Sequence, residues 1–208
     1  MDALREVDLG GEKSFIGAWY LSDLTLCDEL IAYFKHCKGN PGQIGRQSRV
    51  EPGQIGHDRK VVPEIKDSLD LISEGQDLAH PVFKKYLYGL NEITRKYIEK
   101  YEAAGAVNAW GIREPINIQY YKPTGGYKIW HTERVGKLAP SINRHLAFMT
   151  YLNDVFDEGG TEFYYQKIKT EARKGLTLIW PTDWTHMHRG VVSPTQEKYI
   201  ITGWFSFL

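Results

Sequence analysis

The chain has 208 residues, of which 42% are hydrophobic, 25% charged and 13% aromatic, a composition typical of a globular domain with one sizeable core. Its 26 basic and 26 acidic residues give a formal net charge of zero, so a nucleic-acid partner is not expected. No apolar run approaches the roughly 20 residues of a membrane span, and the polar N-terminus is unlike a secretory signal, which predicts a cytoplasmic protein without membrane attachment.

The first hundred residues show a mostly helical pattern. A serine and an aspartate stand before a run of apolar residues at helical spacing, which predicts a capped helix over 24–34. A longer amphipathic helix is predicted over 81–101, where Pro81 suits the first turn because no backbone N–H is needed there. The stretch 61–72 is ambiguous.

The two cysteines, Cys27 and Cys37, lie in or at the end of the first predicted helix. If the helix runs through both, ten residues at about 1.5 Å rise each separate them by roughly 15 Å, which is beyond the reach of a disulfide. Reduced thiols fit a cytosolic protein.

A glycine- and proline-rich connection from about Gly39 to Arg59 contains the sequence Pro-Gly-Gln-Ile-Gly twice, at 41–45 and 52–56. Two copies of five residues do not make a repeat architecture, so we expect a long structured loop with two similar turns. The alternative is a mobile lid, because loops often carry binding and catalytic residues.

After Gly105, short runs rich in Ile, Tyr, Phe, Thr and Trp alternate with Gly, Pro, Asn and Asp, which is typical of an all-β sandwich or barrel. The predicted strands are Ile116–Tyr121, Gly126–His131, His145–Leu152, Thr161–Phe163, Gly175–Trp180, His186–Val192 and Lys198–Ser206. We therefore predict an α+β fold in a single domain, 1–208. A mainly helical part with a long loop (1–105) supports a double-stranded β-helix, or jelly roll (106–208).

The strongest chemical signal is His131-Thr132-Glu133. In extended backbone, residues i and i+2 point the same way, so His131 and Glu133 can share a metal ion while Thr132 faces away. A second imidazole could come from His186 or His188, and alternation cannot choose between these two because they also share a face. Two imidazoles and one carboxylate are the ligand set of a non-haem Fe(II) oxygenase.

The last predicted strand begins with Lys198, ten residues after His188. Alternation places Lys198 on one side of this strand, together with Ile200, Thr202, Trp204 and Ser206. If that side faces inward, an unpaired buried ammonium would be costly, so an anionic ligand inside the roll is indicated. The alternative is that the Lys198 end of this face is simply solvated.

The second half of the chain carries these motifs in order: Tyr121-Lys-Pro-Thr-Gly-Gly-Tyr127, His131-Thr-Glu133, Arg144, Tyr151-Leu-Asn153, Gly159-Gly-Thr-Glu-Phe163, Lys174-Gly175, His188-Arg-Gly190, Lys198 and Trp204. The set resembles the Fe(II)/2-oxoglutarate-dependent dioxygenases, in particular their prolyl 4-hydroxylase-like branch. The resemblance covers roughly residues 115–208 and implies a jelly-roll core.

The resemblance also implies roles for single residues. His131, Glu133 and His188 would bind Fe(II), with His186 as a neighbour, and Lys198 would pair with the distal carboxylate of 2-oxoglutarate. The remaining matches are hydrogen-bonding residues near the co-substrate and one residue beside the metal: Tyr121, Tyr151, Thr202 and, at the metal, Trp204.

One departure from the family concerns Glu133, which stands where an aspartate is usual. The extra methylene lengthens the arm of the ligand, so either the backbone retreats or the coordination changes. Some relatives tolerate glutamate at this position, and metal binding is therefore still expected.

The activity implied by the resemblance uses Fe(II), 2-oxoglutarate and O2, with ascorbate as a candidate reductant, and forms succinate and CO2 while an unactivated C–H is hydroxylated. A peptidyl proline is the first candidate substrate. The alternatives are a free amino acid or other small metabolite, and a nucleic acid, which the balanced charge disfavours. A non-catalytic, cupin-like binding protein is a further alternative, against which the complete ligand set and Lys198 argue. The small size suggests a bacterial or viral type of enzyme.

Overall fold

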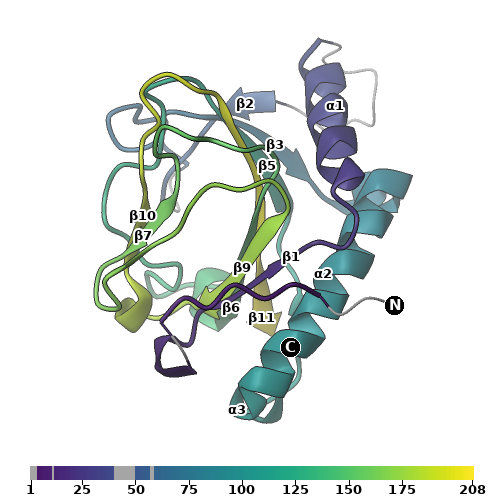
Figure 1. Cartoon of the computed structure of the whole chain (residues 1–208), viewed down its shortest axis with the longest axis vertical. Helices are drawn as coiled ribbons and strands as arrows, with labels where there is room; N and C mark the ends of the chain where they lie inside the picture. Colours follow the sequence, from purple (N-terminus) through teal and green to yellow (C-terminus); the bar gives the residue numbers. More distant parts are fainter. Residues whose placement is uncertain (1–3, 11, 40–49, 57–58) are drawn as a thin grey trace.

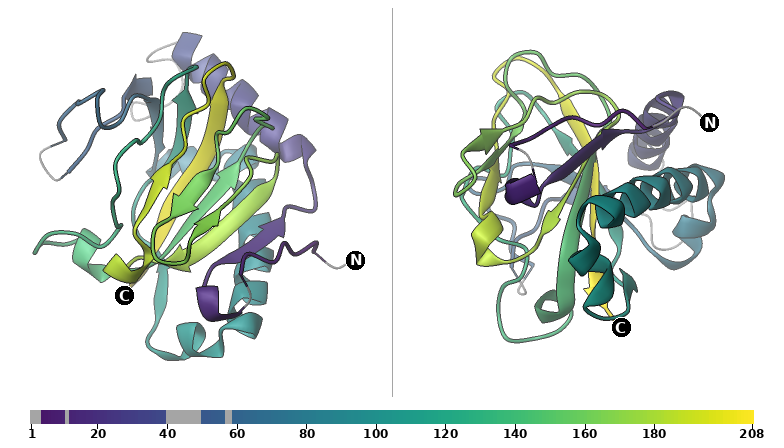
Figure 2. Two further views of the ribbon diagram at one scale, coloured as in Figure 1. Left: turned by 60° about the vertical axis from the view of Figure 1, so that its left-hand side comes forward. Right: turned by 60° about the horizontal axis from the view of Figure 1, so that its bottom comes forward.

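Two antiparallel β-sheets face each other, and two long helices cover the outer face of the larger sheet (Figure 1). The computed structural model describes residues 4–10, 12–39, 50–56 and 59–208. The helices are α1 (Thr25–Gly39) and α2 (Pro81–Lys100), which lie on the same side of that sheet in both views of Figure 2. The predicted jelly-roll core is confirmed.

The larger sheet has the strand order β1-β9-β6-β11-β5-β3-β2, and β4 pairs with β11. Its strands are β1 (Gly17–Tyr20), β2 (Val50–Pro52), β3 (Leu69–Ser73), β4 (Trp110–Ile112), β5 (Ile116–Tyr121), β6 (Arg144–Tyr151), β9 (Leu176–Pro181) and β11 (Lys198–Phe207). The smaller sheet has the order β10-β7-β8, with β7 (Thr161–Phe163), β8 (Ile168–Lys169) and β10 (His188–Gly190). The short helices are η1 (Glu12–Ser14), η2 (Gly75–Ala79), α3 (Glu102–Ala106), η3 (Ser141–Asn143) and η4 (Trp184–His186).

The central strand β11 shows the predicted alternation. Tyr199, Ile201 and Phe205 pack into the core beneath the helices. The intervening residues Lys198, Ile200, Thr202 and Trp204 line a cavity between the sheets. One strand therefore forms part of the core with one face and the floor of the cavity with the other.

Both predicted helices are confirmed. Asp23 caps α1, since its carboxylate accepts the backbone N–H of Thr25 at 2.9 Å. The helix continues to Gly39 and carries both cysteines, which are buried and unbridged. The apolar face of α2 buries large side chains against the sheet, each of which contributes on the order of 1.5–3 kcal/mol: Phe83, Tyr86, Leu90, Ile93 and Tyr97. Among the described residues, no helix has both the length and the apolar character that crossing a membrane requires.

The prediction of a mainly helical part over 1–105 is wrong in one respect, because this part also supplies the strands β1, β2 and β3. These strands join the larger sheet through β9 and β5. They are three to five residues long, and their hydrogen-bonding partners lie far away in the sequence, so local periodicity does not reveal them. The ambiguous stretch 61–72 runs into β3.

Two strand predictions in the second half are wrong. The segment 126–131 is no strand and is held instead by single bridges from Tyr127 to Lys66 and from His131 to His188. The segment 186–192 contains the 3-10 turn η4 and only three residues of strand, β10. The predicted loop over 39–59 falls largely on residues 40–49 and 57–58, which lie outside the described part of the chain. Within it, Val50–Pro52 forms β2 instead of loop.

Candidate functional site

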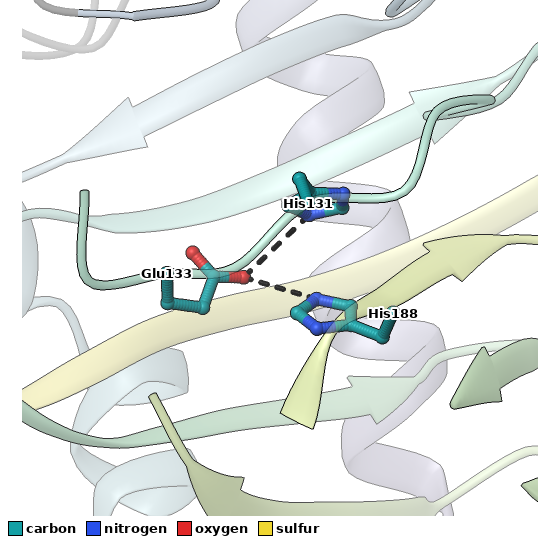
Figure 3. A group of neighbouring side chains, drawn as sticks. All are labelled: His131, Glu133 and His188. Atoms are coloured by element: carbon teal, nitrogen blue, oxygen red, sulfur yellow. Dashed lines mark ion pairs between the residues drawn. The ribbon is translucent and has the colours of Figure 1, made fainter. Parts of the chain in front are cut away.

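His131, Glu133 and His188 come together from two separate segments of the chain (Figure 3). His131 and His188 form an isolated antiparallel bridge, in which each backbone N–H donates to the carbonyl of the other residue at 2.9 Å. Glu133 Oε1 lies 3.2 Å from His188 Nε2 and 3.8 Å from His131 Nε2. The three ligand atoms all lie within 4.8 Å of one another, close enough to bind one metal ion.

Backbone carbonyls orient both imidazoles. His131 Nδ1 lies 3.1 Å from the carbonyl oxygen of Ile129, and His188 Nδ1 lies 2.9 Å from that of His186. Because a carbonyl oxygen can only accept, each Nδ1 carries the hydrogen and each Nε2 keeps a lone pair for a metal. Such outer hydrogen bonds fix the tautomer and ring orientation of metal-binding histidines.

Aromatic side chains surround the two imidazoles. Tyr127 stacks on His131 with a centroid distance of 3.8 Å and an interplanar angle of 14°. The ring of Trp180 meets the His188 ring edge-on, with centroids 5.1 Å apart. These contacts restrict ring rotation and keep water away from the imidazoles.

The electrostatics of the three residues favour the protonation states that a metal needs. Burial, together with the neighbouring His188, lowers the pKa of His131 to about 4, so this imidazole is neutral near pH 7. Burial alone would oppose ionisation of Glu133, but His188, His131 and Arg144 outweigh it and hold the pKa of the carboxyl well below its usual range. Neutral imidazoles and an ionised carboxylate are the forms that bind metal. This donor set, open on the cavity side, fits Fe(II).

Lys198 lies in the same cavity, which has a volume of about 360 Å³. The side chain is only 5% exposed, and its ammonium donates to the carbonyl oxygens of Gly159 at 2.8 Å and Val191 at 3.3 Å. Among the described residues no carboxylate pairs with it, and burial lowers the pKa of Lys198 to about 8. The predicted inward orientation is confirmed, and a buried cation without a counter-ion marks a place for an anion.

The pKa of Lys198 gives a pH prediction. The ammonium is charged below about pH 8 and loses its charge above it, and an anionic co-substrate binds the charged form. We expect kcat/KM for 2-oxoglutarate to be level up to about pH 7 and to fall by about tenfold per unit well above pH 8. Steady-state kinetics from about pH 6.5 to about pH 9.5 would measure this. In Lys198→Arg the guanidinium stays charged, so the fall should disappear, whereas a wild-type profile that stays level to the alkaline end would contradict the assignment.

Two other predicted co-substrate residues also line the cavity. The Tyr121 hydroxyl donates to Gln119 Oε1 at 2.6 Å, and the Lys198 ammonium lies 5.1 Å from the centre of the Tyr121 ring. Thr202 Oγ1 donates to the backbone carbonyl of Phe148 at 2.8 Å. Both hydroxyl hydrogens are therefore already in use, and each oxygen keeps acceptor capacity only.

The structure places Tyr151 one layer behind the cavity wall, in contrast to the predicted contact with the co-substrate. Its hydroxyl lies 2.7 Å from Thr161 Oγ1 and 2.8 Å from Thr170 Oγ1, inside the apolar cluster behind the floor. Thr161 itself lines the cavity. Tyr151 is thus placed to orient Thr161, and Thr161 is the residue that the sequence did not single out.

Further polar residues line the cavity and were not predicted. A buried ion pair joins Lys66 to Asp70 at 2.5 Å, and Ser68 Oγ donates to the same carboxylate at 2.7 Å. Asn117 and Gln119 project from β5 on the same side as Tyr121. The period-two alternation of β5 carried the signal for these last two, whereas the Lys66–Asp70 pair has no local motif.

Comparisons with known proteins agree with this geometry. Residues 116–206 match the model of the 2OG-Fe(II) oxygenase superfamily. A prolyl 4-hydroxylase of Pseudomonas putida has a similar structure, with a TM-score of 0.66, 16% identity and 92% of each chain covered. The viral collagen prolyl hydroxylase of Paramecium bursaria Chlorella virus-1, solved with 2-oxoglutarate, gives a TM-score of 0.63 and 16% identity, covering 100% of this chain and 97% of that one.

A third similar structure is a prolyl hydroxylase of Trichoplax adhaerens in complex with a peptide fragment of the hypoxia-inducible factor oxygen degradation domain. Its TM-score is 0.66 at 15% identity, covering 92% of this chain and 83% of that one. No curated protein matches the sequence.

The fold, the cavity and the family match define the class of protein. Residues 116–206 form a 2OG-Fe(II) oxygenase domain, and the chain is a 2-oxoglutarate-dependent dioxygenase with the fold of the prolyl 4-hydroxylases. Enzymes of this superfamily use Fe(II), 2-oxoglutarate and O2.

Proposed function

We propose that this chain hydroxylates a prolyl residue of a peptide or protein, as a single catalytic domain that includes the N-terminal strands and helices. One observation carries the proposal: the cluster of His131, Glu133 and His188 faces the same cavity as the unpaired Lys198 ammonium. A metal and a dicarboxylate could therefore be held side by side.

The three clustered residues would hold Fe(II), which supplies the oxidising chemistry once 2-oxoglutarate and O2 are bound. Lys198 would bind the distal carboxylate of 2-oxoglutarate, while Tyr121 and Thr202 would border the co-substrate and Tyr151 would support it through Thr161. Trp180 and Tyr127 would exclude water from the metal ligands. Ascorbate would serve as the reductant that restores Fe(II) after unproductive turnovers.

The choice of a peptidyl proline is supported by the similar structures. One of them is a collagen prolyl hydroxylase, and another is a prolyl hydroxylase in complex with a peptide. A free amino acid is the second candidate. The cavity carries charges of both signs, including the pairs Lys66–Asp70 and Arg144–Glu114, and such a wall suits a small zwitterion.

A succinate assay tests the proposal. Purified protein with Fe(II), 2-oxoglutarate and O2 should release succinate faster when a proline-containing peptide is added, and the peptide should gain one oxygen atom by mass spectrometry. Free proline and other amino acids in parallel reactions discriminate the second candidate. Stimulation by free amino acids alone would replace the peptide with a metabolite, and the absence of succinate in every reaction would refute the dioxygenase function.

A further inference from the structure

The two oxygens of the Glu133 carboxylate have different partners. Trp204 Nε1 donates a hydrogen bond to Oε2 at 2.8 Å. The other oxygen, Oε1, is the one that lies 3.2 Å from His188 and 3.8 Å from His131. In Figure 3 both dashed lines to the imidazoles start from this one oxygen. The carboxylate therefore presents one oxygen to the metal position and directs the other towards the indole.

Arg144 holds this arrangement from behind. Its guanidinium stacks on the Trp204 ring, with the central carbon 3.6 Å from the ring centre. Arg144 Nη1 donates to the backbone carbonyl of Glu133 at 2.9 Å and lies 3.8 Å from Glu133 Oε2. Glu114 fixes the other edge of the guanidinium, accepting from Nε at 2.8 Å and from Nη2 at 2.5 Å. Both the backbone and the carboxylate of Glu133 are thus fixed.

The number of oxygens that a carboxylate offers matters at such a site. A carboxylate can bind a metal through one oxygen or through both, and two-oxygen binding would take a position that the co-substrate or O2 needs. A glutamate arm is longer than an aspartate arm by one bond of about 1.5 Å and has one more rotatable torsion. Glu133 could therefore turn both oxygens to the metal if nothing held it.

We propose that Trp204 and Arg144 are positioning residues that fix Glu133 as a one-oxygen ligand. We call Trp204, Arg144 and Glu114 the carboxylate clamp. The clamp takes up the additional length of Glu133, which explains how a glutamate can stand where an aspartate is usual. This inference depends on the proposed metal site, because it concerns one ligand of that site.

A double-mutant cycle on metal affinity tests the clamp. Purified full-length protein is titrated with Mn(II) without 2-oxoglutarate or substrate, and free Mn(II) is followed by electron paramagnetic resonance. Trp204→Phe keeps the ring and removes the hydrogen bond, so we expect about 10- to 100-fold weaker Mn(II) binding, the usual cost of losing an outer-shell partner. In the Glu133→Asp background, where the shorter arm no longer reaches the indole, Trp204→Phe should cost less than about threefold.

A matched control is Trp180→Phe. Trp180 is also buried, lines the same cavity and contacts His188, but its Nε1 has no hydrogen-bond partner among the described residues. This change should weaken Mn(II) binding far less than Trp204→Phe. Thermal unfolding checks that each variant folds. Arg144→Lys keeps the charge but loses the stacking and the fork, so it should weaken binding in the same direction and serves if Trp204→Phe does not fold.

Absorption spectra of the Co(II)-loaded protein give a readout that a purely structural role would not change. Release of Oε2 in Trp204→Phe should alter the ligand-field bands, and Trp180→Phe should not. Wild-type affinity in Trp204→Phe, or an equal loss with Glu and with Asp at position 133, would overturn the clamp while leaving the proposed function intact. A wild-type protein that binds no Mn(II) would instead refute the proposed metal site itself.

Discussion

Replacing His188 with alanine should abolish turnover. His188 Nε2 lies nearest to Glu133 of the two imidazoles, and its ring is fixed by the carbonyl of His186 and the edge of Trp180. Loss of a direct ligand should exceed the roughly 10- to 100-fold cost of an outer-shell change. Mn(II) titration and succinate release measure the two consequences, and both should fall together.

His186 provides the matched comparison, since it stands two residues earlier and is only 4% exposed. Its two ring nitrogens are already engaged, one 3.0 Å from the Ser14 carbonyl and the other 3.0 Å from Thr185 Oγ1. His186→Ala should therefore lower the free energy of unfolding by about 1–3 kcal/mol, yet it should retain measurable activity. Reversed effects of the two changes would mean that His186 is the ligand.

Replacing Lys198 with alanine should produce the second large effect. A 2-oxoglutarate carboxylate in the cavity would lose its buried cationic partner, which costs on the order of 2–5 kcal/mol. Each 1.4 kcal/mol corresponds to about a factor of ten, so the loss amounts to about thirty-fold to several-thousand-fold. It should appear mainly as a raised KM for 2-oxoglutarate, with Mn(II) affinity nearly unchanged, because Lys198 does not lie among the metal ligands.

A conservative variant sharpens this prediction. Lys198→Arg should recover part of the lost affinity, although the planar guanidinium has to fit the space beside Gly159 and Val191. Unchanged 2-oxoglutarate affinity in Lys198→Ala would remove this residue from the co-substrate site. Loss of Mn(II) binding in the same variant would point to a general disturbance of the cavity.

Local patterns predicted the features that local physics determines. The alternation along β11 correctly placed Lys198 and Trp204 on one inner face, because successive side chains of a strand point to opposite sides. The helical periodicity and the first-turn proline predicted α2. His131 and Glu133 also share one site, although the segment that carries them pairs with β10 by a single bridge and forms no strand.

The remaining features depend on contacts between residues far apart in the sequence. Alternation could not choose between His186 and His188, because the choice depends on the 3-10 turn η4, which directs His186 towards Ser14. The pairing of β1 with β9 and of β3 with β5 joins distant segments in the same way. The contact of Trp204 with Glu133 spans 71 positions and has no local signal.

The most direct test of the dioxygenase function follows the two atoms of molecular oxygen. The purified protein is incubated with Fe(II), 2-oxoglutarate, a proline-containing peptide that stimulates turnover, and heavy-isotope oxygen gas, and both products are analysed by mass spectrometry. We predict one labelled atom in succinate and one in the hydroxylated peptide, and neither product in His188→Ala. Succinate and hydroxylated peptide that both lack the label, or formation of both by His188→Ala, would contradict the proposed site and its chemistry.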